Sequence, residues 1–289
     1  MRDQQWEREP KTKDDSWDPK PVPPPRIYGI VAREAPICVI FRRGPSDRVQ
    51  TLQWNTETDE ITAGQWFSGR IYEKRGDLSP DGKYMAYFAA KRSDQRPPER
   101  QTYTVISRTP FLRALSLWWK GDSWGGGALF ESADHVLLND PEWAHRASFV
   151  EDKEHPCPVK TSLLGAPRGE DWPIEAIRLE RDGWVFQEKD GRYLMDRPID
   201  GFQLRMNYIF GGSKYSYFDR SGVEHPLTDW EWADVDCHGS VLGAKEGKLL
   251  KARPADVLEG QLSEIADLSP HRFERVQAPD WAREWCSEE

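Results

Sequence analysis

Residues 77–88 are Asp77-Leu78-Ser79-Pro80-Asp81-Gly82-Lys83-Tyr84-Met85-Ala86-Tyr87-Phe88. The ring of Pro80 fixes its backbone φ, and Gly82 accepts the positive φ that closes a tight turn. The aromatic and apolar residues that follow have the composition of a β-strand. The stretch therefore predicts a β-hairpin, and similar combinations of turn and strand recur through most of the chain.

Short predicted strands separated by glycine-containing turns follow one another along the sequence. We expect strands at residues 37–41, 49–54, 61–67, 84–88, 103–106, 112–119, 128–130, 135–138, 174–179, 184–186, 193–195, 202–210, 215–218, 234–237, 241–244 and 249–250. Turns such as Asp182-Gly183 and Ser221-Gly222 are typical of antiparallel hairpins. Many short antiparallel strands form a sandwich, a closed barrel or a propeller. Because groups of strands recur at roughly 40 to 50 residues, we predict an all-β fold, a β-propeller of about five blades with short helical insertions.

Three segments depart from this pattern. Residues 1–25 are charged and end in a run of prolines, so we expect a disordered arm outside a single propeller domain at 26–289. Residues 139–173 contain a helix-start signal at Asp140-Pro141 and then several prolines, which predicts an inserted loop with a short helix. Residues 254–289 predict a C-terminal segment with short helices, because the apolar positions fit one helical face. These positions are Val257, Leu258, Leu262, Ile265 and Leu268.

The composition argues against several classes of partner. The 289 residues carry a formal net charge of −9, and an acidic surface repels phosphate backbones, so we expect no nucleic-acid partner. No apolar run approaches the roughly 20 residues that cross a bilayer, and the N-terminus has no apolar signal core. The four cysteines are scattered, which is typical of reduced thiols. We therefore expect a cytoplasmic protein with no membrane contact.

The segment from Leu78 to Tyr87 resembles the repeat motif of TolB-like, WD-type bacterial β-propellers. Trp232-Ala233-Asp234 and the hairpins up to Leu250 are similar in a looser way. The runs Gly69–Glu73 and Leu117–Gly127 also resemble an unassigned group of bacterial hypothetical proteins. The first resemblance implies a propeller fold whose members bind protein partners, peptides or sugars, or act as enzymes. The second implies no activity.

Asp234, Asp236 and His238 alternate along a predicted strand, so their side chains would share one face. Two carboxylates and an imidazole are able to hold a divalent metal ion. The simpler interpretation is the exposed face of a half-buried strand, with Val235 and Cys237 turned inward. We prefer the simpler interpretation and expect no metal and no cofactor, with these three residues as weak metal candidates.

Tryptophan is unusually frequent, with 14 in the chain, and three of these lie close together at Trp118, Trp119 and Trp124. Adjacent residues on a strand point to opposite faces, so one of Trp118 and Trp119 is a candidate for exposure. Exposed rings beside Asp122 would stack on a sugar or anchor a protein partner. The alternative is that neighbouring blades cover both faces, which would place both rings in the core.

No recognisable catalytic motif occurs in the sequence. The leading hypothesis is therefore a non-catalytic interaction module, a scaffold or accessory subunit of a cytosolic bacterial system with a protein partner. The alternative is a carbohydrate-binding or glycoside-hydrolysing propeller, which would use a pair of carboxylates in the central pocket. The sequence makes no prediction about oligomeric state.

Overall fold

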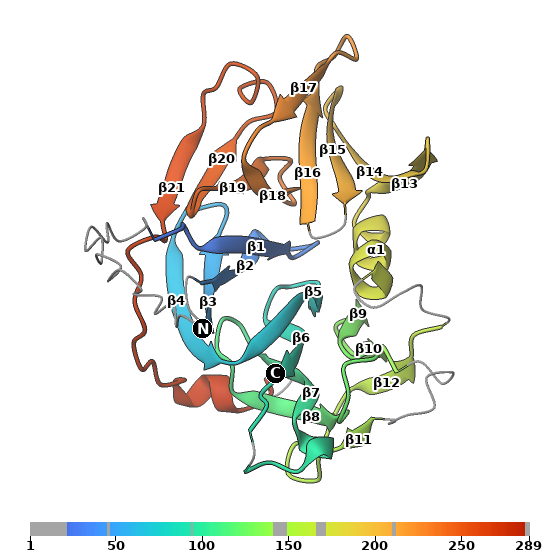
Figure 1. Ribbon diagram of the computed structural model, residues 1–289, viewed down its shortest axis with the longest axis vertical. Coiled ribbons are helices and arrows are strands. Elements are labelled where there is room, and N and C mark those ends of the chain that lie inside the picture. Colours follow the sequence, from blue (N-terminus) through green and yellow to red (C-terminus); the bar gives the residue numbers. More distant parts are fainter. Residues whose placement is uncertain are drawn as a thin grey trace, which may run out of the picture.

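The computed structural model describes residues 22–44, 47–93, 95–140, 149–165, 172–209 and 212–286. Its strands form five sheets, numbered here as blades 1 to 5 in the order in which their first strands occur along the chain (Figure 1). This arrangement confirms the predicted all-β propeller of about five blades. Most of the predicted N-terminal arm, and the predicted helix start that follows Asp140, lie outside the described residues.

The blades have the following strands. Blade 1 contains β1 (Arg26–Val31), β2 (Ile37–Arg43), β3 (Arg48–Asn55) and β4 (Ile61–Ser68). Blade 2 contains β5 (Arg70–Leu78), β6 (Tyr84–Ala90), β7 (Thr102–Arg108) and β8 (Ala114–Trp119), with β11 (Val150–Glu151) beside β8. Blade 3 contains β9 (Ala128–Ser132), β10 (His135–Leu138) and β12 (Lys160–Leu163). Blade 4 contains β13 (Val185–Lys189), β14 (Arg192–Ile199), β15 (Phe202–Ile209), β16 (Gly212–Phe218) and β17 (Glu224–Leu227). Blade 5 contains β18 (Trp230–Val235), β19 (Val241–Lys245), β20 (Lys248–Ala252) and β21 (Ser263–Asp267).

The predicted turn at Ser79–Gly82 joins β5 to β6. The Ser79 N–H donates to the Tyr84 carbonyl at 2.9 Å, and Gly82 has a φ of 71°. One carboxylate oxygen of Asp81 accepts hydrogen bonds from the Ser79 hydroxyl at 2.6 Å and the Lys83 N–H at 3.1 Å. Each residue of the motif thus has the role that the sequence assigns to it, because the turn depends only on neighbours in the chain.

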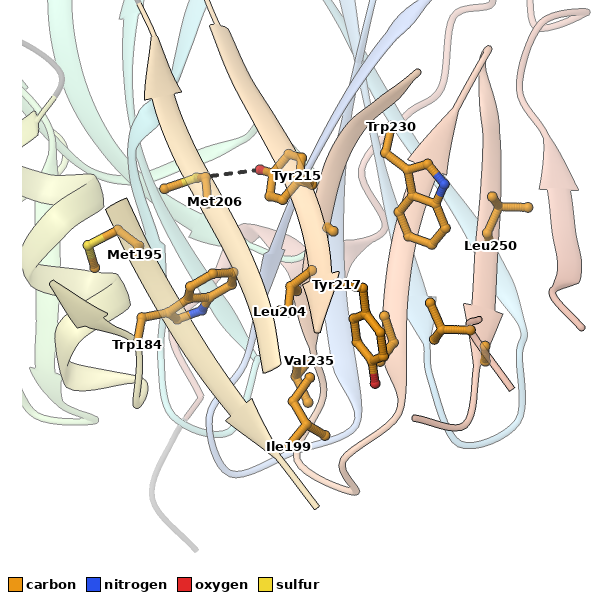
Figure 2. Close-up of a cluster of buried hydrophobic side chains, with 14 of the residues drawn as sticks. Trp184, Met195, Ile199, Leu204, Met206, Tyr215, Tyr217, Trp230, Val235 and Leu250 are labelled. Carbon is orange, nitrogen blue, oxygen red and sulfur yellow. Dashed lines mark hydrogen bonds between the residues drawn. The ribbon is translucent and has the colours of Figure 1, made fainter. Parts of the chain in front are cut away.

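The ring is held together by apolar contacts between neighbouring sheets. Strands β18, β1, β5 and β9 contact one another in that order, and β16 contacts β18. Figure 2 shows the cluster between blades 4 and 5, where Met206 and Tyr215 face Trp230 across the interface. Trp54 of blade 1 is fully buried against blade 5 in the same way. Each large apolar side chain buried like this contributes about 1.5 to 3 kcal/mol.

Helix α1 (Trp172–Arg181) lies between blades 3 and 4, where the ring has no direct sheet-on-sheet cluster among the described residues (Figure 1). Ile174 packs with Leu129 of β9, and Leu179 joins the core of blades 4 and 5. The predicted strand at residues 174–179 is therefore wrong. The helix buries charged side chains as well as apolar ones, so Glu175 and Arg178 do not mark the solvent-exposed face that identifies a surface helix.

Helix α1 ends just before Gly183. The sequence pattern predicts a hairpin turn at Asp182-Gly183, but Gly183 caps the helix instead. The Trp184 N–H donates to the Leu179 carbonyl at 2.8 Å, and the Gly183 N–H donates to the Glu180 carbonyl at 3.2 Å. Gly183 has a φ of 93°. These are the bonds and the left-handed residue of a Schellman motif, which ends a helix and redirects the chain.

The C-terminal segment forms a strap, defined here as residues 268–286, across the edges of blades 1 and 2 (Figure 1). The helix predicted from Val257 to Leu268 is absent, because turns and strand β21 occupy these residues. Arg42 donates to the Leu268 carbonyl at 3.1 Å, and the Cys286 N–H donates to the Tyr84 hydroxyl at 2.7 Å. A short 3-10 helix at Asp280–Arg283 is the described helical part of this segment.

Gly183→Ala is expected to lower the free energy of unfolding by about 2 to 3 kcal/mol. A β-carbon at this position would collide with Nη1 of Arg197, which donates to the Asp182 carbonyl, and the left-handed φ disfavours alanine. Urea denaturation of the purified variant measures the change.

Gly191→Ala is the matched control, since Gly191 also has a positive φ, of 69°, but open space around it. It should cost only about 1 kcal/mol, from the backbone alone. Equal losses in the two variants would contradict the role given to the contact with Arg197.

Candidate functional site

Helix α1 places three charged side chains at the centre of the ring. Glu175, Arg178 and Arg181 are spaced three residues apart, so they project from neighbouring positions of the helix. The helix packs against β5, one of the strands that line the axis. The side chain of Glu175 is 1% exposed, so its charge requires partners inside the protein.

Glu175 and Arg178 share Tyr28 of β1 as a partner. The Tyr28 hydroxyl donates to Oε1 of Glu175 at 2.9 Å, and Nζ of Lys74 donates to Oε2 at 3.0 Å. Arg178 donates to the Tyr28 oxygen at 2.6 Å and to the Gly76 carbonyl at 2.5 Å. Burial raises the pKa of Tyr28, so its hydroxyl keeps the proton that it donates to Glu175.

Arg181 makes a two-pronged ion pair with Asp77. Its two terminal nitrogens donate to the two oxygens of the Asp77 carboxylate at 2.7 and 3.0 Å, and that carboxylate is fully buried. The Phe130 N–H donates to Asp77 at 2.7 Å, and Arg181 donates to the Phe130 carbonyl at 2.7 Å. These bonds join α1 to β5 and β9. The axial network is defined here as Tyr28, Lys74, Asp77, Glu175, Arg178 and Arg181.

Two cavities lie along β1 and β18, one near each end of these strands. The Tyr28 cavity, of about 220 Å³, is lined by residues that include Arg26, Tyr28, Glu73, Lys74, Tyr215 and Glu231. The Asp234 cavity, of about 50 Å³, is lined by residues that include Arg33, Asp182, Arg197, Asp234, Asp236 and Cys237. The axial network lies between these two cavities.

The Asp234 cavity contains two carboxyl groups with raised pKa values. Burial raises the pKa of Asp234 to about 6, against the opposing hydrogen bond from the Val235 N–H. The Trp184 ring N–H also donates to Asp234, at 3.1 Å. Burial likewise raises the pKa of Asp182, against hydrogen bonds from its neighbour Arg181. Perturbed acids of this kind are a feature of catalytic sites, although buried ion pairs produce them too.

The size of the Asp234 cavity limits what these acids are able to do. A volume of about 50 Å³ has room for a few water molecules and not for a sugar ring. Oδ2 of Asp236 and Nε of Arg197 are buried beside it and have no hydrogen-bond partner within the described part of the chain. The cavity is therefore too small to enclose a glycan.

The three weak metal candidates do not come together. Strand β18 ends at Val235, so Asp236 lies in the following turn, where its Oδ1 accepts from the N–H groups of His238 and Ser240. Asp234 lines the cavity, whereas His238 is exposed on the turn. The alternation along a strand, on which the metal prediction depended, therefore stops after Asp234, before the second of the three residues.

Among the described residues, metal-type ligand atoms converge at Asp152, Glu154 and His155. Oδ1 of Asp152 already accepts from the Glu154 N–H at 3.0 Å and lies 3.0 Å from Nδ1 of His155. Its Oδ2 accepts from the Trp119 ring N–H at 2.8 Å. These bonds explain the cluster as a turn that anchors β11 to β8.

The three tryptophans predicted to form a binding surface differ in burial. Trp118 is 3% exposed and lies in the core between blades 2 and 3. Trp119 packs on the opposite face, edge-on to Tyr103 at 5.4 Å. Asp122 accepts a hydrogen bond from the Trp124 N–H at 2.9 Å and lies 3.5 Å from Nζ of Lys120. Trp124 is 41% exposed, so of the three rings it is the one available to a partner.

The axial network was missed at the sequence level. Its helical residues lie in the segment that was interpreted as a strand, and their partners are about 100 to 150 positions away in the chain. The spacing of Glu175, Arg178 and Arg181, together with Pro173 in the first turn, was the available signal for a helix with one charged side.

No helix in the described ranges is long and apolar enough to cross a membrane. No family model matches the chain, and no curated protein matches it. Solved structures similar to the chain include an uncharacterized protein of Listeria monocytogenes, with 12% identity, coverage of 84% of each chain and a TM-score of 0.29. Another is a candidate 6-phosphogluconolactonase of Bacteroides fragilis, with 10% identity, coverage of 90% of this chain and 96% of that one, and a TM-score of 0.29. These scores carry no argument about activity, and membership of the TolB-like or WD-type families stays a resemblance.

Asp234→Asn is expected to raise stability at neutral pH. The pKa of about 6 in the folded state lies above the ordinary value of 3.8, so between these values the unfolded chain releases a proton that the folded protein keeps. Wild-type stability therefore falls as pH rises through this window, and below it the cost disappears. The variant should exceed wild type by about 1 to 3 kcal/mol at pH 7 and much less at pH 4. Urea denaturation across this range measures the difference.

Asp219→Asn is the control, because the pKa of Asp219 is shifted in the opposite direction to that of Asp234. Hydrogen bonds from Ser221 and the Val223 N–H hold the pKa of Asp219 well below its usual range. This variant should lose stability at pH 7 and approach wild type as the pH falls. A constant difference between Asp234→Asn and wild type from pH 4 to pH 7 would contradict the assignment for Asp234.

Proposed function

We propose that the chain is a non-catalytic protein-binding module of a cytosolic bacterial system, a scaffold or accessory subunit that binds its partner on the outside of the ring. The observation that carries this proposal is the filled axis. The charged side chains of helix α1 and their partners in the axial network occupy the centre, and the cavities near its two ends measure about 220 and 50 Å³. Both are below the roughly 300 to 1,000 Å³ of ordinary small-molecule sites.

The exposed apolar side chains support the same proposal. Most of those described on the surface lie on edge strands, loops and the strap, and none of them lines either axial cavity. They are Val22, Trp124, Val150, Leu163, Val185, Tyr193, Val223, Phe273 and Trp281. Tryptophan and tyrosine are enriched among the residues that dominate binding energy at protein interfaces.

A carbohydrate-active propeller is the second candidate, favoured by the raised pKa values of Asp182 and Asp234 in one cavity. A hydrolase of this kind holds a sugar ring between two carboxyl groups. The Asp234 cavity is too small for that ring, and its tryptophan neighbour, Trp184, is 3% exposed and so not available as a sugar platform. The protein-binding proposal therefore fits the geometry better.

Affinity capture tests the proposal. The tagged full-length chain, used as bait in lysate of the encoding organism, should recover one or more proteins above background by mass spectrometry. The purified chain, incubated with a panel of glycans, should release no product. Asp234→Asn should capture the same proteins as wild type. Capture of no protein, together with glycan turnover that Asp234→Asn abolishes, would overturn the proposal in favour of the hydrolase.

A further inference from the structure

An open groove of about 470 Å³ lies between the strap and the adjoining edges of blades 1 and 2. Its apolar lining comes from Leu112, Val276 and Ala278, and its charged lining comes from Arg113 and Arg283. It is larger than either axial cavity and lies away from the axial network. We call it the strap groove.

The walls of the strap groove are fixed by hydrogen bonds within the protein. The Gln65 side chain bridges them, since its amide nitrogen donates to the Val276 carbonyl at 2.8 Å and its oxygen accepts from the Leu112 N–H at 2.8 Å. Nε of Arg283 donates to the Ala278 carbonyl at 3.3 Å. A groove held in this way needs little ordering when it binds, which favours affinity.

The charge of the strap groove is opposite to that of the molecule. The chain has a net charge of −9, yet the residues that the structure describes around the groove include two arginines and no acidic residue in its lining. Arg113 is exposed. Arg283 is half exposed and lies 3.5 Å from Asp280, whose side chain is 99% exposed. Such a surface pair is weak, so the Arg283 guanidinium is able to exchange this partner for a stronger one.

The surface beside the groove carries an aromatic anchor. Trp281, which belongs to the strap, is 53% exposed. Its ring meets Phe111 edge-on at 5.4 Å, and the Arg108 guanidinium lies 5.1 Å from the ring centre. A tryptophan held in place by its neighbours and still exposed is the type of residue that contributes most to binding a partner.

We propose that the strap groove binds an acidic segment of a partner protein, with an aliphatic side chain on the apolar lining and carboxylates on Arg113 and Arg283. This inference rests on the proposed protein-binding function and names the partner chemistry. Arginine suits the role because its planar guanidinium pairs with a carboxylate through two parallel hydrogen bonds. The aliphatic side chains in the same lining select a peptide over a simple anion.

The test uses fluorescence anisotropy with the full-length chain and a fluorescein-labelled probe, Glu-Glu-Leu-Glu-Glu with an amidated C-terminus. The expected result is saturable binding that weakens as salt is added, with no binding of the Gln-Gln-Leu-Gln-Gln counterpart. Arg113→Glu should weaken binding at least about tenfold, equivalent to about 1.4 kcal/mol. Arg192→Glu is the matched control, because it makes the same charge change at an exposed site in blade 4.

Three results would overturn the proposal. The first is equal binding of the acidic and glutamine probes, and the second is an equal loss in Arg113→Glu and Arg192→Glu. The third is probe binding that appears only after Asp14, Asp15 and Asp18 are replaced by Asn. That result would mean that the acidic N-terminal segment of the wild-type chain itself occupies the strap groove.

A photo-cross-linking residue at position 112, in the lining of the strap groove, distinguishes the strap-groove proposal from the more general proposal of a protein-binding function. Capture that recovers a partner cross-linked at this position supports both proposals. A partner that is captured without cross-linking there contradicts the strap groove and leaves the protein-binding function standing. Capture of no partner by the wild-type chain contradicts the protein-binding function itself.

Discussion

The buried ion pair between Arg181 and Asp77 is the contact that fixes helix α1 against the inner strands of blades 2 and 3. Asp77 lies on β5, and its carboxylate accepts hydrogen bonds from Arg181 of α1 and from the backbone of Phe130 on β9. One carboxylate therefore joins blade 2, blade 3 and the helix. Removing one partner of such a pair strands the other charge in the interior, which typically costs about 3 to 5 kcal/mol.

The helix has this importance because the interface between blades 3 and 4 differs from the other four. Elsewhere two sheets face each other and apolar side chains fill the space, as between blades 4 and 5 (Figure 2). At this interface a helix contributes Ile174 to one side and Leu179 to the other. A helix in this place also brings its polar side chains to the axis, where sheets alone would leave a channel. Helix α1 thus both fills the axis and completes the ring between blades 3 and 4.

The sequence predicts those parts of this structure that depend on local chemistry. The Ser79–Gly82 turn was predicted correctly because its hydrogen bonds lie within six residues of each other. Helix α1 was not, because its charged side, which includes Glu175 and Arg178, is buried and so does not mark a solvent-exposed face, and its Asp182-Gly183 end also matches a hairpin turn. Asp234 was identified, but its role depended on Trp184 and on where β18 stops, which are consequences of packing. The strap groove gave no sequence signal, since Gln65, Arg113 and Arg283 meet only in the folded ring.

The strap connects closure with binding. Blades 1 and 5 are each built from one continuous stretch of chain, so in the part of the chain that the structure describes no strand from one terminus completes the blade of the other. Their union depends on apolar packing and on the strap, which Arg42 and Gln65 of blade 1 and Tyr84 of blade 2 hold by hydrogen bonds. The same segment supplies Val276, Ala278 and Arg283 to the strap groove. A partner that binds there engages the closed ring and not the open chain, so by mass action its binding stabilises closure.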